Sequence, residues 1–371
     1  MSSNGYPPYS RAGSSRQGQS HNPQRYGTQS QPNNNHRSLH DAAVGGYHGQ
    51  SHDTQLLPHQ IVASQSQPSP PQEGQQRPCG ANLTGQVRIL DEPGQNYRMS
   101  IGDGGFSDVY KGEYFSAVDA GPITTFVAVK LFRISRNGGH GELWPERVTK
   151  RITRESDIWF SLNHSNIQPY FGYCEGLGPS VALISPYCGN RTIMTFITNN
   201  PQINKSPLIK DIAKGLSYLH SKNVIHCDLN CNNVLVDAAG RAILTDFGRA
   251  KIIGDVFYST PLMAGTAQYM APELLHPTEE VDINELFSKQ SDVYAFGILS
   301  YEIFTGEEPF ACHNVRFDWQ VVPLVQKGNR PLCTTHVQRC ISQATWAMME
   351  ACWAAAPEDR PSADQIVQGL H

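Results

Sequence analysis

The chain has 371 residues, and its 29 Lys and Arg against 33 Asp and Glu give a formal net charge of −4. This balance gives no reason to expect nucleic acid or a membrane surface as a partner. No apolar run is long enough for a membrane span, and the first residues lack the apolar core of a secretory signal. The nine cysteines include no C-x-x-C pair. They are expected to be reduced thiols, which favours an intracellular, cytoplasmic location and leaves a nuclear one open.

Residues 1–80 differ in composition from the rest of the chain. They are rich in Ser, Gln, Asn, Gly, Pro and His, and their apolar runs are very short. Such a segment cannot bury enough apolar surface to offset the entropy lost on ordering, so it is predicted to be a disordered tail. Residues 82–371 carry strand and helix patterns throughout and are predicted to form one large domain of two lobes.

The first part of this domain is expected to be rich in strands. Residues 125–132 (TFVAVKLF) and 181–187 (VALISPY) are β-branched and apolar, as in buried strands. Between them, residues 146–162 have apolar residues at helical spacing and basic residues in between. The apolar positions of this predicted helix are Val148, Ile152, Ile158, Phe160 and Leu162.

The second part of the domain is expected to be mainly helical. Residues 206–222 begin with a predicted Ser cap followed by Pro. The apolar face of this helix is Leu208, Ile212, Leu216 and Leu219. Residues 290–306 are apolar nearly all round, which predicts a buried central helix ending at Gly306.

Residues 101–112 (IGDGGFSDVYKG) are rich in glycine. Closely spaced glycines let a backbone turn tightly and bring N–H groups against phosphate oxygens. Alone, the pattern is equally typical of an ordinary glycine hairpin. It is neither a P-loop, since G-x-x-x-x-G-K-[ST] does not occur, nor a dinucleotide-binding turn, since a strand follows it and not a helix.

Eight motifs follow one another in an informative order. They are the glycine loop, Lys130 in VAVK, Glu155, HCDLNCNN (226–233), TDFG (245–248), APE (271–273), SDVYAFG (291–297) and CWAAAPEDRP (352–361). This set resembles the eukaryotic protein kinase family over residues 95–371. The segment SDVYAFGILSYEIFTGEEPF (291–310) resembles the corresponding segment of the tyrosine-kinase-like group of Ser/Thr kinases. The resemblance implies a bilobal α+β fold. A small antiparallel β-sheet lobe with one main helix spans about 82–187, and a larger helical lobe spans about 190–371.

The resemblance also implies roles for single residues. Lys130 would bind the α/β-phosphates of ATP, Glu155 would hold Lys130, and Asp228 would accept or orient the proton of the substrate hydroxyl. Without the resemblance, Glu155 would be read as a solvated helix charge. Asn233 and Asp246 would ligate Mg²⁺. The residues implied to bind the nucleotide are Ile101, Gly102, Gly104, Gly105, Val109, Ala128, Lys130, Ser185 at the gatekeeper position, Cys188 in the hinge, and Leu235.

Four further residues are implied to be structural. Glu273 and Arg360 would form a buried ion pair, Asp292 would anchor the backbone of the catalytic loop, and His226 would pack against the DFG segment. The residue types of HCDLNCNN also permit a metal–thiolate site with His226 and two cysteines, Cys227 and Cys231. That alternative is disfavoured because no fourth ligand stands at a zinc-like spacing.

The loop departs from the family pattern at Cys227. An Arg usually stands there and pairs with a phosphate on the activation loop. Activity is therefore expected not to depend on phosphorylation of Tyr258, Ser259 or Thr260. A smaller departure is Ser107, in place of the third glycine of the loop, with a modest expected effect on ATP affinity.

A second departure is Asn230, where Ser/Thr kinases usually carry a Lys that contacts the γ-phosphate. Asn232 fills a position where tyrosine kinases carry an Arg, so neither cation is present. Loss of such a donor raises a barrier by about 2–4 kcal/mol, or a factor on the order of a hundred in rate. The change Asn230→Lys is expected to raise the rate if this position limits it.

Three functions follow from these observations. The first is an active Ser/Thr kinase that uses ATP and Mg²⁺ on protein substrates. Thr266 in GTAQYMAPE favours Ser/Thr over Tyr, since it is expected to hydrogen-bond to Asp228. The second is a nucleotide-binding pseudokinase scaffold. The third is an interaction protein whose tail is the functional element, and a regulatory partner of the tail is left open in every case.

Overall fold

The computed structural model of the chain describes residues 77–91, 100–103, 107–118, 121–133, 143–253, 267–275, 286–313, 315 and 320–370. Residues 1–76 lie outside this part, so the predicted tail stays a prediction. The backbone N–H of Cys79 donates to the Ser156 hydroxyl (3.1 Å), and its carbonyl accepts from the Tyr170 hydroxyl (2.9 Å). Among the described residues, Cys79 thus already contacts the domain, three residues before its predicted start at residue 82.

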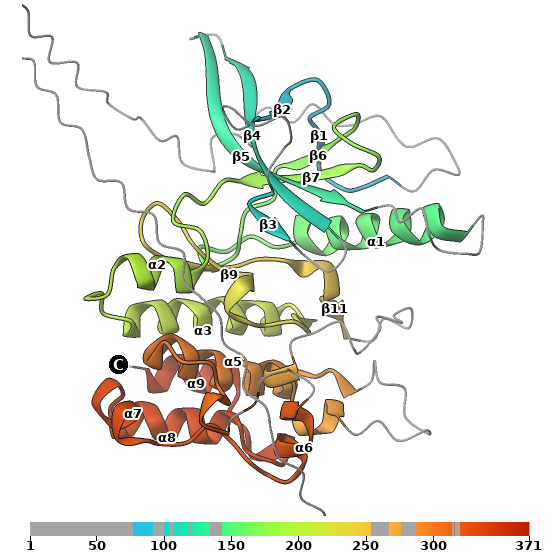
Figure 1. Ribbon diagram of the computed structural model, residues 1–371. Coiled ribbons are helices and arrows are strands. Elements are labelled where there is room, and N and C mark those ends of the chain that lie inside the picture. Colours follow the sequence, from blue (N-terminus) through green and yellow to red (C-terminus); the bar gives the residue numbers. More distant parts are fainter. Residues whose placement is uncertain are drawn as a thin grey trace, which may run out of the picture. The chain divides into compact units, whose positions relative to one another are not determined.

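The first part of the chain forms a β-sheet, seven-stranded among the described residues (Figure 1). Its order is β1 (Ala81–Asn82), β6 (Gly172–Cys174), β7 (Ala182–Pro186), β5 (Gly121–Phe132), β4 (Ser107–Val118) and β2 (Val87–Ile89), with β3 (Gly102–Asp103) also paired to β4. All pairings are antiparallel except β1 with β6, which is parallel. The expected antiparallel sheet is confirmed, apart from this edge.

Strands β4 and β5 form the long hairpin of the sheet. They pair over twelve residues, from Ser107 opposite Phe132 to Val118 opposite Gly121, so β5 begins four residues before the predicted strand. Val127 and Val129 are fully buried and pack with Ile184 of β7. This apolar layer fixes the register of β5, and the register in turn positions Lys130.

Helix α1 (Leu143–Phe160) is the main helix of this part. Ile152, Ile158 and Leu162 are buried as predicted, but Phe160 is 51% exposed and Trp159 is 3% exposed. At 100° per residue, positions 152, 155 and 159 share one face, and position 160 turns away from it. The expectation that Phe160 belongs to the buried face is therefore wrong, and Trp159 takes that place.

The second part is mainly helical among the described residues. Its α-helices are α2 (Ile193–Asn199), α3 (Ser206–Ser221), α5 (Lys289–Thr305), α6 (Val321–Gln326), α7 (Thr335–Cys340), α8 (Gln343–Cys352) and α9 (Ala363–Gly369). Short 3₁₀ turns are η3 (Cys231–Asn233), η4 (Phe247–Arg249), η6 (Ala267–Tyr269), η7 (Pro272–Leu275), η8 (Ala311–His313) and η10 (Pro357–Asp359). Two small sheets pair β9 (Val234–Val236) with β10 (Ala242–Leu244) and β8 (Val224–Ile225) with β11 (Lys251–Ile252).

Helices α3 and α5 form the interior of this part. The four predicted apolar residues of α3 are each at most 2% exposed. The predicted Ser206 cap is wrong, because Lys205 occupies the N-cap and the Ser206 N–H donates to the Asn204 side chain (3.1 Å). Helix α5 is buried nearly all round and ends as predicted at Gly306, whose φ of 73° is left-handed.

No helix of the described residues has the length and apolar character needed to cross a membrane. All nine cysteines lie among the described residues, and none of them forms a disulfide.

Candidate active site

Lys130 lies at the centre of the candidate site. Its Nζ donates to Glu155 Oε1 (2.5 Å) and to Asp246 Oδ1 (2.7 Å). The side chain of Lys130 is 11% exposed and that of Glu155 is 1% exposed. The predicted Lys130–Glu155 pair is thus formed. It joins β5 to α1, and Asp246 adds the segment between β10 and η4.

The charges of this cluster support one another. Burial alone would lower the pKa of Lys130, but the carboxylates of Asp246 and Glu155 raise it, so the ammonium group stays charged. Burial likewise works against ionisation of Asp246, but Lys130 outweighs it and the pKa of Asp246 is lowered to about 2. Burial raises the pKa of Glu155, and Lys130 opposes this shift.

Gly248 leaves the space that Glu155 needs. A Cβ at position 248 would lie 2.7 Å from Glu155 Oε2, and this oxygen has no hydrogen-bond partner among the described residues. A side chain at position 248 would therefore displace the carboxylate that holds Lys130.

Asp292 at the start of α5 anchors the loop 226–233, as predicted. Its Oδ2 accepts from the backbone N–H of His226 (2.8 Å), and its Oδ1 accepts from the N–H of Cys227 (3.0 Å). The ring Nε2 of His220 lies 3.0 Å from Oδ2. Cys227 is left-handed, with φ of 63°, so these bonds hold a backbone conformation that a residue with a Cβ rarely adopts.

His226 packs against the DFG segment, as predicted. Its ring centroid is 5.6 Å from that of Phe247, which is 6.0 Å from Trp159. Its Nδ1 accepts from the backbone N–H of Asp228 (3.3 Å), so Nε2 donates to the Thr245 carbonyl (3.1 Å). A row of three rings therefore connects α1 to the loop.

Asp228 and Asn233 are hydrogen-bonded to each other. Asn233 Nδ2 donates to the Asp228 carbonyl (2.7 Å) and to its carboxylate (3.3 Å). The carbonyl of Asn233 accepts from the N–H of Thr245 (3.0 Å), so Asp246 follows directly beside it. Asn233 Oδ1 and Asp246 Oδ2 accept no hydrogen bond among the described residues. Such oxygens are the ligands that Mg²⁺ prefers, so the two predicted metal residues fit this ion.

The described residues contain no group of three or more His, Cys, Asp or Glu side chains that could hold a metal ion. A zinc site needs several such ligands together, so nothing among the described residues supports the metal–thiolate alternative for the loop.

Asn230 is part of the loop's own hydrogen bonding. Its Oδ1 accepts from the N–H of Asn232 (2.9 Å), which caps η3, and its Nδ2 donates to the Asp228 carbonyl (3.0 Å). The side chain is 6% exposed. Asn230 is therefore a structural amide and supplies no cation to the site.

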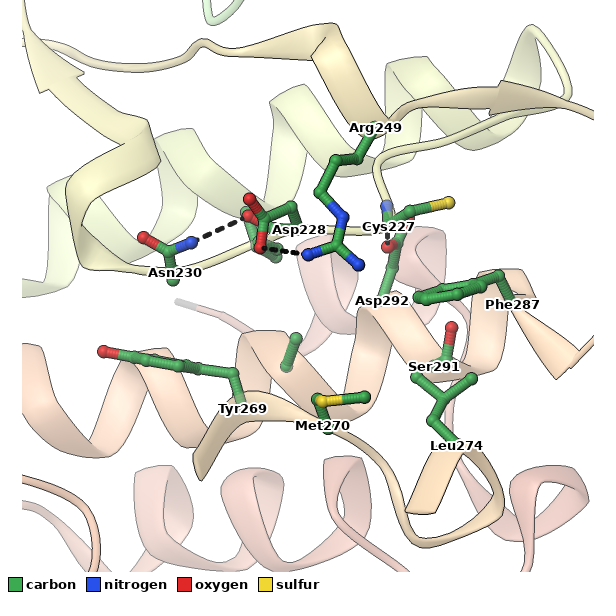
Figure 2. Close-up of a pocket in the computed structure, with 12 residues that line it drawn as sticks. Cys227, Asp228, Asn230, Arg249, Tyr269, Met270, Leu274, Phe287, Ser291 and Asp292 are labelled. Carbon is green, nitrogen blue, oxygen red and sulfur yellow. Dashed lines mark hydrogen bonds and ion pairs between the residues drawn. The ribbon is translucent and has the colours of Figure 1, made fainter. Parts of the chain in front are cut away.

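Arg249 lies beside Asp228 and was not among the site residues expected from the sequence. Its Nη1 is 3.8 Å from Asp228 Oδ1, and its side chain is 8% exposed (Figure 2). Burial raises the pKa of Asp228, and the Arg249 cation opposes this shift. An arginine directly after DFG was the available signal in the sequence.

Most of the predicted nucleotide-binding residues that the structure describes lie on β3, β4, β5 and β7, with Ile101 just before β3 and Cys188 just after β7. The N–H of Ile101 donates to the Val109 carbonyl (2.7 Å), Gly102 pairs with Val109, and Ala128 pairs with Ser185. Leu235 lies on β9, within the helical part, and forms a bridge to Thr192. The glycines at 104 and 105 lie outside the described residues, as do Tyr258, Ser259, Thr260 and Thr266.

Gln168, which was also not expected from the sequence, holds the segment after β7 in place. Its Nε2 donates to the Pro186 carbonyl (2.7 Å), and its Oε1 accepts from the Cys188 thiol (3.4 Å). Its own carbonyl accepts from the indole N–H of Trp159 (2.7 Å). Burial raises the pKa of Cys188 to about 12, so this thiol stays protonated and can donate.

Glu273 and Arg360 form the predicted ion pair. Nη1 to Oε1 is 2.7 Å and Nη2 to Oε2 is 2.8 Å, so the pair is bidentate, and the Arg360 side chain is fully buried. Arg360 also donates to the carbonyls of Ala354 and Gln290. The pair ties η7 to the segment before α9.

The chain was compared with known proteins. A family model described as "Protein tyrosine and serine/threonine kinase" matches residues 96–370. Serine/threonine-protein kinase CTR1 of Arabidopsis thaliana is 28% identical over 283 residues, which cover 74% of this chain and 31% of that protein. In the same species, the putative cysteine-rich receptor-like protein kinase 20 is 31% identical over 296 residues, covering 73% and 40%. Serine/threonine-protein kinase STY17 is 26% identical over 276 residues, covering 72% and 42%.

The matched part thus spans between 31% and 42% of the length of these relatives. The family model matches well over half of this chain, and the sheet, the helical part and the Lys130–Glu155 contact agree with the expected architecture. The chain belongs to the protein kinase family and has its bilobal α+β fold.

Proposed function

We propose that the chain is an active protein kinase that transfers the γ-phosphoryl group of ATP to Ser and Thr hydroxyls of protein substrates. The observation that carries the proposal is the contact of Lys130 with both Glu155 and Asp246. This contact holds a buried, charged ammonium group against Asp246, which is one of the two proposed Mg²⁺ ligands, in a chain of the protein kinase family.

Each residue then has a defined task. Lys130 binds the α/β-phosphates, and Glu155 and its α1 helix hold the ammonium in position. Asn233 and Asp246 hold Mg²⁺, which neutralises phosphate charge when bound. The substrate hydroxyl oxygen forms a bond to the γ-phosphorus and the bond to the β–γ bridging oxygen breaks. The hydroxyl proton passes to Asp228, and ADP leaves with the electron pair.

The choice of Ser and Thr as acceptors rests on two supports. Two of the relatives described above are named serine/threonine-protein kinases. The motif GTAQYMAPE carries Thr266, which we expect to hydrogen-bond to Asp228. The proposed substrates are proteins, and the nine free thiols are consistent with a reducing, cytoplasmic location.

A transfer assay tests the proposal. The purified chain receives labelled ATP, Mg²⁺ and a generic protein substrate, and Asp228→Asn serves as the matched control. We expect label on Ser and Thr that disappears in the Asp228→Asn variant. Label on Tyr alone would overturn the assignment of the acceptor, and equal transfer by both proteins would overturn the role of Asp228.

A nucleotide-binding pseudokinase is the second candidate. The observation in its favour is that Asn230 is a neutral amide bonded within its own loop, so the usual cation is missing. This candidate predicts binding of Mg–ATP without transfer. Binding titrations run beside the transfer assay distinguish the two functions.

A further inference from the structure

Arg249 occupies an unusual place in the molecule. It follows Asp246, Phe247 and Gly248 in the turn η4 and directs its guanidinium group toward Asp228 (Figure 2). It lines the same pocket as Asp228 and Asn230. A buried cation therefore lies next to the proposed base. The Lys that usually contacts the γ-phosphate is absent from this site, because position 230 is Asn.

The guanidinium group of Arg249 is not saturated. Its Nε and Nη1 are buried and have no hydrogen-bond partner among the described residues. Arg360 shows the contrast, because it donates to both oxygens of Glu273 and to three backbone carbonyls. Nη1 lies 3.8 Å from Asp228 Oδ1, which is an ion pair and too long for a hydrogen bond. Buried polar groups are nearly always hydrogen-bonded, so the N–H groups of Arg249 that make no hydrogen bond indicate an acceptor that arrives from outside.

The backbone around Arg249 is held in place. Phe247 is 1% exposed, and its carbonyl accepts from the N–H of Ala250 (3.0 Å). Arg154 of α1 donates to the Ala250 carbonyl (2.6 Å). The guanidinium group therefore extends from a fixed turn, which suits a group that must meet a ligand in one geometry.

Asn230 and Arg249 differ in whether their side chains are available to a phosphate. The Asn230 side chain is bonded to its own loop, so it cannot reach a phosphate without breaking those bonds. A guanidinium group offers planar, paired donors that match phosphate oxygens. Arg249 has this geometry and stands beside Asp228, where the transferred group must pass.

We propose that Arg249 is the γ-phosphate cation of this active site, in place of the Lys that is absent at position 230. Its unpaired N–H groups bind oxygens of the γ-phosphoryl group as that group moves from ADP to the substrate hydroxyl. This inference rests on the proposed function, because it assigns a residue to that same reaction.

Binding and transfer are measured in parallel to test the inference. The variants are Arg249→Leu and Arg249→Lys, and the matched control is Arg241→Leu, which removes an exposed arginine paired with Asp237. We expect Arg249→Leu to lower kcat by a factor on the order of a hundred. It should weaken binding of an ATP analogue with a β–γ imido bridge by about tenfold and leave ADP affinity unchanged. Arg249→Lys should keep part of both.

A rescue experiment separates a direct contact from a structural role. Adding Asn230→Lys to Arg249→Leu should restore at least part of kcat, because a cation returns to the position that the family uses. Asn230→Lys should raise kcat by a larger factor in the Arg249→Leu background than in the wild-type chain, where Arg249 already supplies the charge.

Three results would overturn the inference alone. They are wild-type kcat in Arg249→Leu, an equal loss of ADP and analogue binding, and a higher rate in Arg249→Leu, which would make the contact with Asp228 inhibitory. A wild-type chain that binds Mg–ATP but transfers no phosphate overturns the proposed function, and the inference falls with it.

Discussion

Single residues decide whether the site works, and Gly248 is one of them. Its missing Cβ leaves room for the carboxylate of Glu155, which in turn holds Lys130. The absence of a side chain at position 248 therefore affects Lys130 indirectly, through Glu155.

We expect Gly248→Ala to lower kcat/KM at least about tenfold, which corresponds to about 1.4 kcal/mol of transition-state stabilisation. The added methyl group would displace Glu155 and loosen Lys130, so affinity for Mg–ATP should fall as well. Titration with Mg–ATP and steady-state kinetics measure both effects. Gly369→Ala is the control, since a Cβ there meets nothing within 4 Å. Unchanged kinetics in Gly248→Ala would contradict the steric argument.

The acid limb of the pH–rate profile should report Asp228. Burial raises its pKa above the usual 3.8, opposed by Arg249, His226 and the hydrogen bond from Asn233, while Asp246 raises it further. Below this pKa the carboxyl group is protonated and cannot accept the substrate proton, so kcat falls as the pH falls.

Arg249→Leu removes a charge that lowers the pKa of Asp228, so the acid limb should move to higher pH. The profile of kcat against pH measures the shift, and Arg241→Leu should leave it in place. An acid limb that stayed in place in Arg249→Leu would show that Arg249 does not act on Asp228.

At this scale the motifs predicted much of the site. Lys130 and Glu155 meet as expected, and Asn233 lies beside the segment of Asp246. Arg249 and Gln168 were missed because neither belongs to a motif that fixes its role. Their importance depends on which side chains fold toward them, and spacing along the chain does not carry that information.

The packing of helices depends on close contacts that the periodicity of apolar residues in the sequence shows only in part. Helix α3 packs Gly215 against the backbone of Asn166, where an added Cβ would lie 2.7 Å from the carbonyl oxygen. That carbonyl also accepts from the N–H of Leu244 (3.0 Å), so it cannot move without disturbing β10.

We expect Gly215→Ala to lower the free energy of unfolding by about 1–3 kcal/mol, as overpacking of a filled interior does. Without the clash, alanine within a helix would stabilise by up to about 1 kcal/mol. Chemical denaturation measures the change, and Gly369→Ala in α9 is the helical control. A stabilised Gly215→Ala variant would show that α3 can shift away from Asn166.

The existence and type of the main helices followed from the sequence, but details of their ends and faces did not. The apolar face of α3 is buried as predicted, whereas Ser206 does not cap it, because the chain enters the helix one residue earlier, at Lys205. In α1, two adjacent aromatic residues competed for one buried position. Trp159 takes it by stacking on Tyr170 (5.1 Å) and bonding to Gln168, contacts that only the fold creates.

Across the whole molecule, the Glu273–Arg360 pair joins positions 87 residues apart in the sequence. The Arg360 side chain is fully buried, so it depends on this carboxylate for its charge balance.

We expect Glu273→Ala to destabilise the chain by about 3–5 kcal/mol, since it leaves a buried guanidinium group without its counter-ion. Thermal unfolding measures the effect. Arg241→Ala breaks the pair with Asp237 from its exposed side and should cost at most about 0.5 kcal/mol. Similar midpoints for the two variants would mean that the carbonyls around Arg360 suffice to hold it.

The family assignment could be made from the sequence because it depends on the order of motifs. That order can be read along the chain without knowing how the side chains pack. The family model over residues 96–370 confirms it. The parallel β1–β6 edge could not be foreseen, since β1 is two residues long and its pairing is made by distant contacts.

The contact of Lys130 with Glu155 and Asp246 also has a thermodynamic consequence. It connects the sheet to the helical part through three charges, so a ligand bound there stabilises both parts at once. A ligand at a hundred times its Kd adds about 2.7 kcal/mol to the folded state. The sheet and the helical part should therefore unfold in one more concerted thermal transition when nucleotide is bound. The steepness of that transition then reports the fraction of chains with nucleotide in the site.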